Sequence, residues 1–208
     1  MKQISTRLMT DTLPLLDAPL DSANQLHLYP YVVPGDWVDA CDPNGDVSEP
    51  FSDDVFLTLV LDGPQGLRRL QGSDLAAAGM TFEDAFAHAA SNLSRAWNSR
   101  HFEFGIACLD DGTHFGGSRG NWMAPAGALV LGNLYQSMVA HFGVREFAAV
   151  AVNRTFLVAF PTDEKTLSSL ALRQLIEESS NGSIHPISRT WLRLDGSWPS
   201  AYRGVPVF

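Results

Sequence analysis

Cysteine is almost absent from this chain, and its scarcity excludes one class of protein. The 208 residues include only Cys41 and Cys108, and two cysteines cannot form the disulfide framework of a small secreted domain. The N-terminus also lacks the apolar stretch of a signal peptide, because Asp11 and Pro14 interrupt it. We therefore expect a cytoplasmic protein.

Long apolar runs are missing as well. The longest covers residues 55–61 with Thr58 inside it, which is about a third of the length that a membrane-spanning helix needs. Hydrophobic residues make up 45% and charged residues 18% of the chain, as in ordinary globular proteins. The sequence therefore predicts a folded protein with no membrane partner.

Basic residues are scarce in the first third of the chain, where the whole net charge of −9 arises. Residues 1–66 hold eleven acids and two bases, whereas the acids and bases of residues 67–208 balance. The excess peaks over residues 36–54, with seven acids and no base. Such a surface repels phosphate backbones, so we expect no direct nucleic-acid binding. It would attract a basic protein, or alternatively serve only solubility.

Three segments carry apolar side chains at helical spacing: 81–98, 125–142 and 163–180. The clearest begins after Thr81, whose hydroxyl can cap the first turn, and its apolar stripe continues to Trp97. We expect these three helices to pack against a sheet.

Strand patterns occupy the segments between the helices. Residues 55–61 predict a central strand that is buried on both faces. Asp111-Gly112 and Asn153-Arg154 predict tight hairpin turns, the second through a positive φ at Asn153, and the glycine-rich residues 116–121 predict a polar loop. The fold class is therefore α+β with a mainly antiparallel sheet. We expect one compact domain over residues 1–208. As an alternative, this domain divides into two lobes, an acidic N-terminal segment 1–54 and a second region 50–198.

The acidic stretch includes a partial match to a calcium-binding loop. Asp42, Asn44, Asp46, Ser48 and Asp53 stand at its ligand positions. The match fails at three further points, because the second position is proline, the sixth is not glycine, and the last ligand is Asp instead of the longer Glu. A plain acidic loop without a metal or other cofactor is the preferred interpretation.

No catalytic constellation stands out. Asp110, Asp111 and His114 could support acid–base chemistry, but the same residues form a good hairpin turn, which we prefer. Cys41 lies among acids, which raise the pKa of a thiol and so disfavour a nucleophilic role. Cys108 lies in an apolar strand, so we expect it to be a small side chain in the core. We therefore predict no catalytic residue.

Three segments carry short motifs in a definite order. Residues 50–97 read PFSDDVFLTLVLDGPQGLRRLQGSDLAAAGMTFEDAFAHAASNLSRAW, in which a Pro-Phe-x-Asp-Asp entry precedes a strand ending in Leu-Asp and a helix with Asn-Leu. FAAVAVNRTFLVAFP follows, and TWLRLDGSW comes near the end of the chain. Together these motifs resemble the YtpQ-like family of uncharacterised bacterial proteins, which has a Pro-Asn-Arg hairpin where this chain has Val152-Asn153-Arg154, and a closing Asp-Gly-x-Trp. The resemblance implies an α+β cytoplasmic domain and transfers no activity.

These observations favour a non-enzymatic protein-binding module, for example an inhibitor or immunity protein that neutralises a basic toxin or enzyme. The alternative is a small metal-dependent hydrolase or nucleotide-handling enzyme that uses Asp and His residues: Asp53, Asp54, Asp110, Asp111 and His114. In a binding module the acids would steer the partner and the aromatic side chains would anchor it, although Trp37 could equally fold inward as a lid. The candidate binding residues are Asp36, Trp37, Asp39, Asp42, Asp46, Phe51, Asp53 and Asp54.

Overall fold

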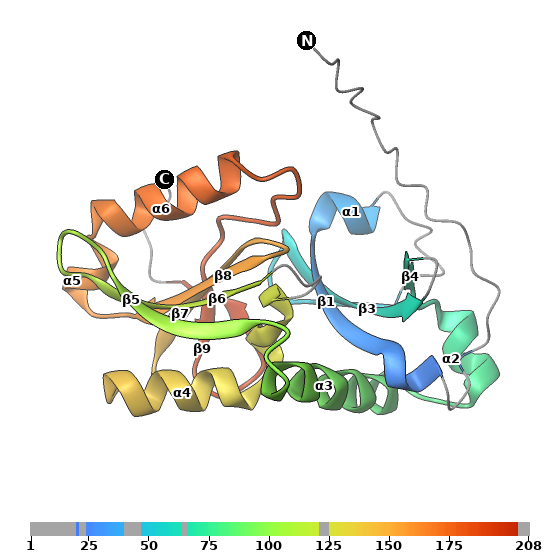
Figure 1. Ribbon diagram of the computed structural model, residues 1–208. Coiled ribbons are helices and arrows are strands. Elements are labelled where there is room, and N and C mark those ends of the chain that lie inside the picture. The colour runs from blue at the N-terminus through green and yellow to red at the C-terminus, as the bar shows by residue number, and fades with distance from the viewer. Residues whose placement is uncertain (1–19, 21–23, 40–46, 64–65, 121–124, 204–208) are drawn as a thin grey trace, which may run out of the picture.

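The computed structural model describes residues 20, 24–39, 47–63, 66–120 and 125–203, and all strand pairs in this part are antiparallel. Two sheets lie side by side, with helices on their faces (Figure 1). The first sheet consists of β1 (Leu28–Pro34), β2 (Ser48–Pro50), β3 (Val55–Gly63) and β4 (Gly66–Arg69). The second consists of β5 (Glu103–Cys108), β6 (His114–Arg119), β7 (Phe147–Asn153), β8 (Phe156–Pro161), β9 (Leu192–Leu194) and β10 (Ser200–Ala201). The predicted α+β class with antiparallel sheets is confirmed.

Strand β3 is the centre of the first sheet, as its apolar run predicted. It pairs with β1 over residues 55–61, and its other edge pairs with β2 and β4. Leu57 and Leu59 are completely buried on one face, and Val60 packs into a separate cluster with Tyr31 on the other. Both faces are therefore covered.

Helix α3 (Phe82–Asn98) covers one of these faces and begins where the sequence placed it. The Thr81 hydroxyl accepts a hydrogen bond from the backbone N–H of Asp84, whose carboxylate accepts in return from the backbone of Thr81. This reciprocal cap satisfies two of the amides that a helix leaves unpaired. Farther along, the Asn92 amide donates to the carbonyls of Gln25 and Leu28 and joins the helix to the start of β1.

The structure adds short elements that the sequence did not indicate. The 3-10 helix η1 (Asn24–His27) precedes β1, α1 (Gly35–Asp39) and β2 occupy part of the stretch expected to be a loop, and α2 (Gly72–Ala78) precedes α3. Each of the other two expected helices is divided into two. The first consists of η2 (Pro125–Val130) and α4 (Gly132–Phe142), and the second of α5 (Glu164–Leu167) and α6 (Leu170–Asn181). The second division occurs at Ser169, whose hydroxyl caps α6 instead of continuing a helix.

Residues 116–119 belong to strand β6, so the prediction of a polar loop there was wrong. This strand lies between β5 and β8 in the second sheet. A Cβ on Gly116 would lie 2.5 Å from the Met138 sulfur and closer still to the Phe104 ring. Glycine therefore serves here to let two large side chains pack against the backbone.

The hairpin turns lie where the sequence placed them, but one has a different basis. Gly112 has a φ of 78° and follows Asp111, whose carboxylate accepts from the Thr113 backbone N–H. In the β7–β8 turn, Asn153 does not have the expected positive φ, because Arg100 is the only non-glycine residue with one in the described part of the chain. The Asn153 side chain instead accepts from the backbone N–H and hydroxyl of Thr155.

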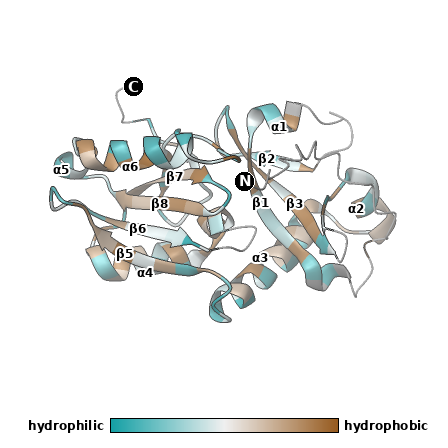
Figure 2. Ribbon diagram, turned by 45° about the horizontal axis from the view of Figure 1, so that its top comes forward, coloured by the Kyte–Doolittle hydropathy of each residue, from teal (hydrophilic) through white to brown (hydrophobic). Residues whose placement is uncertain are grey.

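One core cluster joins the two sheets. It includes Val32 and Leu57 from the first sheet, Ala149 and Leu157 from the second, and Leu93 from α3. Figure 2 shows hydrophobic residues along these strands. Alternate residues of β7 enter this cluster on the side of α4 and a second cluster on the side of α6. The six-stranded sheet is therefore covered on both faces, as Figure 1 also shows.

Cys108 is exposed, so the prediction of a small core side chain was wrong. It lies at the end of β5, which is the last strand at its side of the sheet and has exposed residues at several positions. Apolar neighbours in the sequence do not bury a side chain on an edge strand. Cys41 lies outside the described residues.

Candidate functional site

The candidate site is a corner at which three segments meet: α1, residues 48–54, and residues 183–190. The backbone N–H of Gly35 donates to the Asp54 carbonyl at 2.9 Å and joins α1 to the turn before β3. The backbone N–H groups of Ile187 and Ser188 donate to carbonyls of β7 and fix the third segment against the second sheet. We call this region the acidic corner.

Asp54 holds the acidic corner together. Its carboxylate accepts hydrogen bonds from the hydroxyls of Ser52 and Thr190, both at 2.8 Å, and from the Ser188 hydroxyl. Partial burial by itself raises the pKa of Asp54, but the hydrogen bonds from Ser188, Thr190 and Ser52 stabilise the ionised form and leave the pKa below its ordinary value. This carboxylate therefore connects residues far apart in the sequence.

Replacing Asp54 by asparagine should lower the free energy of unfolding by about 1 kcal/mol at neutral pH, since three charge-assisted hydrogen bonds to a half-exposed group are weakened. Asp53→Asn is the matched control, because Asp53 is exposed and no hydrogen bond or ion pair involves its side chain in the described part of the chain. Urea denaturation measures both. Equal stability of the two variants would contradict the role of Asp54.

The same pair of variants has a pH signature. A carboxyl whose pKa is lowered by folding stabilises the protein above its unfolded-state pKa, and this contribution disappears as the pH falls through the folded-state value. The stability difference between wild type and Asp54→Asn should therefore be constant above about pH 5 and shrink below the ordinary Asp value of 3.8. Denaturation curves at several pH values test this, with Asp53→Asn again as the control.

Trp37 is half-buried on α1. The Arg69 guanidinium lies over its ring, with Cζ 4.2 Å from the ring centroid, and a cation in this position is attracted by the π electrons. Trp37 also packs against the cluster of Tyr31, Val33 and Val60. The sequence left open whether Trp37 is an exposed side chain that anchors a partner or a side chain that folds inward as a lid. In the structure the Trp37 side chain packs against the first sheet and is still partly exposed.

Three carboxylates of the acidic corner remain exposed. The side chains of Asp36, Glu49 and Asp53 make no hydrogen bond and no ion pair in the described part of the chain. They come from α1, from β2 and from the turn before β3. Glu49 was not among the predicted site residues, although the count of acids over 36–54 included it.

Not all predicted site residues can be placed. Asp39 ends α1, but its side chain lies outside the description, as do Asp42 and Asp46 altogether. Of the predicted acids, the structure brings Asp36, Asp53 and Asp54 together at the corner.

Phe51 is a core residue, so its prediction as a surface anchor was wrong. Only 3% of its surface is exposed, and its ring centroid lies 5.3 Å from that of Trp198. The backbone N–H of Phe51 donates to the Val55 carbonyl, and the side chain belongs to the cluster that joins the two sheets. The acidic neighbours of Phe51 in the sequence do not indicate that its side chain is buried, because its core contacts come from segments far along the chain.

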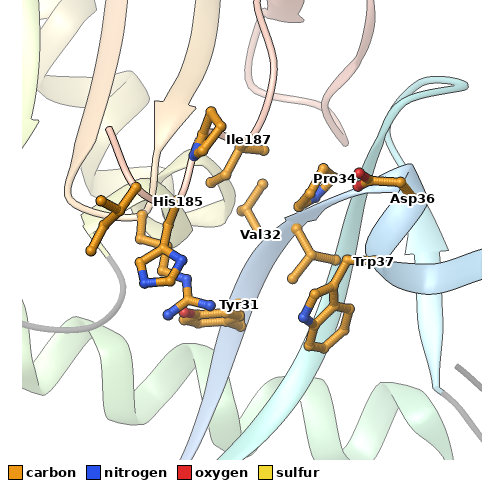
Figure 3. A pocket seen from close by; sticks show the side chains of 11 residues that line it. Tyr31, Val32, Pro34, Asp36, Trp37, His185 and Ile187 are labelled. Carbon is orange, nitrogen blue, oxygen red and sulfur yellow. The ribbon is translucent and has the colours of Figure 1, made fainter. Parts of the chain in front are cut away.

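Beside the acidic corner lies an open cavity of about 280 Å³. Figure 3 shows β1, with Tyr31, Val32 and Pro34, on one side and residues of the 184–187 segment on the other. The remaining lining residues are Val33, Asp36, Trp37, Arg154, Ile184, His185, Pro186 and Ile187. Sequence reasoning missed Arg154 and the 184–187 segment, because no local pattern indicates that they approach β1.

Ser48 and Asp111, two of the residues considered for metal binding or catalysis, have structural contacts of another kind. Ser48 lies in β2 opposite Thr58 and not in a cation-binding turn. Asp111 accepts from the Ser169 hydroxyl at 2.6 Å, and this hydrogen bond holds its pKa below the ordinary value. Within the described ranges, no group of three His, Cys, Asp or Glu residues is arranged to hold a metal ion. The hairpin interpretation of Asp110, Asp111 and His114 therefore agrees with the structure.

Comparisons of the chain with protein-family models, curated proteins and solved structures gave no match. Among the residues that the structure describes, no helix has the length and apolar character needed to cross a membrane.

Proposed function

We propose that this protein is a non-enzymatic binding module that recognises a protein with a basic surface through the acidic corner. An inhibitor or immunity protein that neutralises a basic toxin or enzyme is one concrete form. The observation that carries the proposal is the set of exposed carboxylates of Asp36, Glu49 and Asp53, which have no basic partner within the described residues. Exposed carboxylates that make no ion pair within the protein are available to cations of another molecule.

The surroundings of these carboxylates suit a protein contact. Exposed ion pairs contribute only about 0–1 kcal/mol each, so apolar side chains must supply much of the affinity. Ile184 is 89% exposed and lines the cavity next to half-buried Trp37 and Pro34. The carboxylates would then steer the partner, and the apolar wall would hold it.

Neutralising the three carboxylates tests whether a cationic partner is attracted to the acidic corner itself or only to the net negative charge of the protein. The variant Asp36→Asn/Glu49→Gln/Asp53→Asn is compared with Glu83→Gln/Glu103→Gln/Asp110→Asn, which removes the same charge from exposed positions elsewhere. The probe is fluorescein-labelled decalysine, and its association rate is measured by stopped flow.

The corner variant should associate about three- to tenfold more slowly at low salt, because electrostatic steering raises association rates by tenfold or more. Its rate should also change less between about 50 and about 300 mM salt, where the screening length falls from above to below about 10 Å. Equal rates for the corner variant and the control variant would refute the proposal, since only total charge would then matter.

A further inference from the structure

We propose that the cavity beside the acidic corner is a binding site for a small carboxylate with an apolar body. This inference is separate from the proposed protein contact, because it concerns a small molecule and a cationic group inside the cavity. It rests on Arg154, on the ring of Tyr31 and on the apolar wall between them and α1.

Arg154 places a cation in the cavity and has no carboxylate partner there. The residue lies in the turn between β7 and β8 and is half-buried, and its Cζ lies 5.6 Å from the centroid of the Tyr31 ring. Arg154 takes part in none of the ion pairs between described residues. A guanidinium matches a carboxylate through two parallel hydrogen bonds, and partial burial strengthens such a pair.

The Tyr31 ring helps to hold the Arg154 guanidinium in one position in the cavity. Only 4% of Tyr31 is exposed, and its register opposite Thr58 fixes it within the first sheet. Attraction between the guanidinium and the ring restrains the long Arg154 side chain before a ligand arrives. His185 lines the same cavity (Figure 3).

The size and the wall of the cavity indicate what accompanies the carboxylate. Its volume of about 280 Å³ is just below the roughly 300 Å³ at which sites for drug-sized ligands begin. Val32 and Ile187 are buried core residues whose side chains face the cavity in Figure 3. A flat or branched apolar group fits against them, so benzoate is a suitable probe.

Asp36 opposes an anionic ligand only weakly. It lines the α1 side of the cavity with Pro34, whereas the Arg154 guanidinium lies over Tyr31. Three residues of strand separate these two ends by about 10 Å. Across this distance in water the carboxylate of Asp36 weakens the binding of a monoanion by only about twofold. A phosphate has no apolar group to place against the apolar wall, so the cavity suits a carboxylate with an apolar body better than a phosphate.

The experiment is a titration of the protein with sodium benzoate at constant ionic strength, followed by NMR. The reporter is the indole N–H signal of Trp37, identified as the one signal of the five tryptophans that Trp37→Phe removes. We expect a saturable shift of this signal in the wild type. Arg154→Gln should weaken benzoate binding about tenfold or more, and Arg154→Lys, which keeps the charge but not the paired donors, should be intermediate.

Two further variants serve as controls, one for which benzoate affinity should not change and one for which it should rise. Arg145→Gln removes an exposed arginine that precedes β7, at the other end of the strand from Arg154, and should leave binding unchanged. Asp36→Asn should strengthen benzoate binding about twofold, whereas the proposed protein contact requires the same change to weaken decalysine association. The two proposals can therefore fail independently.

The inference would be overturned if the wild type showed no saturable shift, or if wild type and Arg154→Gln bound benzoate with equal affinity. It would also be overturned if inorganic phosphate bound more tightly than benzoate. Acetate, which lacks the apolar body, should bind more weakly than benzoate, and equal affinities would remove the role of the apolar wall. The remaining indole signals report whether each variant is folded.

Discussion

Replacing Phe51 by alanine should lower the free energy of unfolding by about 3–4 kcal/mol, which is the usual effect of removing a buried aromatic ring. The ring lies in the core that both sheets share and contacts Trp198, so its loss leaves a cavity that neighbouring segments fill only in part. Urea denaturation measures the change. Phe51→Leu should retain much of the stability, because it keeps an apolar side chain in the space.

Trp198→Ala is the informative companion to Phe51→Ala. Trp198 contacts both Phe51 and Phe86 but is 42% exposed, so its removal should destabilise the protein by only about 1–2 kcal/mol. A surface anchor would give the opposite pattern, with little change in stability for Phe51→Ala. Wild-type stability of Phe51→Ala would therefore contradict the buried position of this ring.

Replacing Gly116 by valine should destabilise the protein by about 3 kcal/mol, because the new side chain has no room. The Phe104 ring and the Met138 sulfur occupy the space that the side chain would need, and β6 is hydrogen-bonded to a strand on each side. The backbone therefore cannot retreat without breaking the sheet. The midpoint of urea denaturation should fall accordingly.

Gly105→Val is the matched control for Gly116→Val. Gly105 lies on the neighbouring edge strand, and a Cβ added there meets no atom within 4 Å. Valine also favours strand conformation, so we expect stability within about 0.5 kcal/mol of the wild type or slightly above it. If both variants unfolded at the same urea concentration, the proposed crowding at Gly116 would be refuted.

The interactions within single segments could be predicted from the sequence. Thr81 and the apolar stripe that follows it determine the start and the buried face of α3 through contacts within a few residues. The run at 55–61 is short, rich in β-branched residues and apolar at nearly every position, which is typical of a strand buried on both faces. Asp111-Gly112 forms its turn through a positive φ at the glycine and a hydrogen bond from the Thr113 backbone N–H to the Asp111 carboxylate. The charge excess of the first third is likewise visible by counting.

The candidate site could be predicted only in part. The sequence identified Asp36 and Asp53 as exposed acids, because charged side chains are rarely buried without a partner. It misplaced Phe51. It placed Asp54 at the surface, where the residue is exposed, but did not reveal that the Asp54 carboxylate accepts from hydroxyls more than 130 positions along the chain. Those contacts depend on where residues 183–190 return to the first sheet.

Tertiary structure also decided which glycines and which cations have special roles. Gly116 looks like part of a polar loop until β5 and α4 bring Phe104 and Met138 against it. Arg154 looks like an ordinary turn residue until the shared core brings β7 and β1 close enough for its guanidinium to approach the Tyr31 ring. The cap of α3, the Asp111-Gly112 turn and the buried run of β3 depend on neighbours in the sequence and could therefore be predicted from it. The cavity and the hydrogen bonds to Asp54 depend on the packing of two sheets against each other, and no local pattern carries that information.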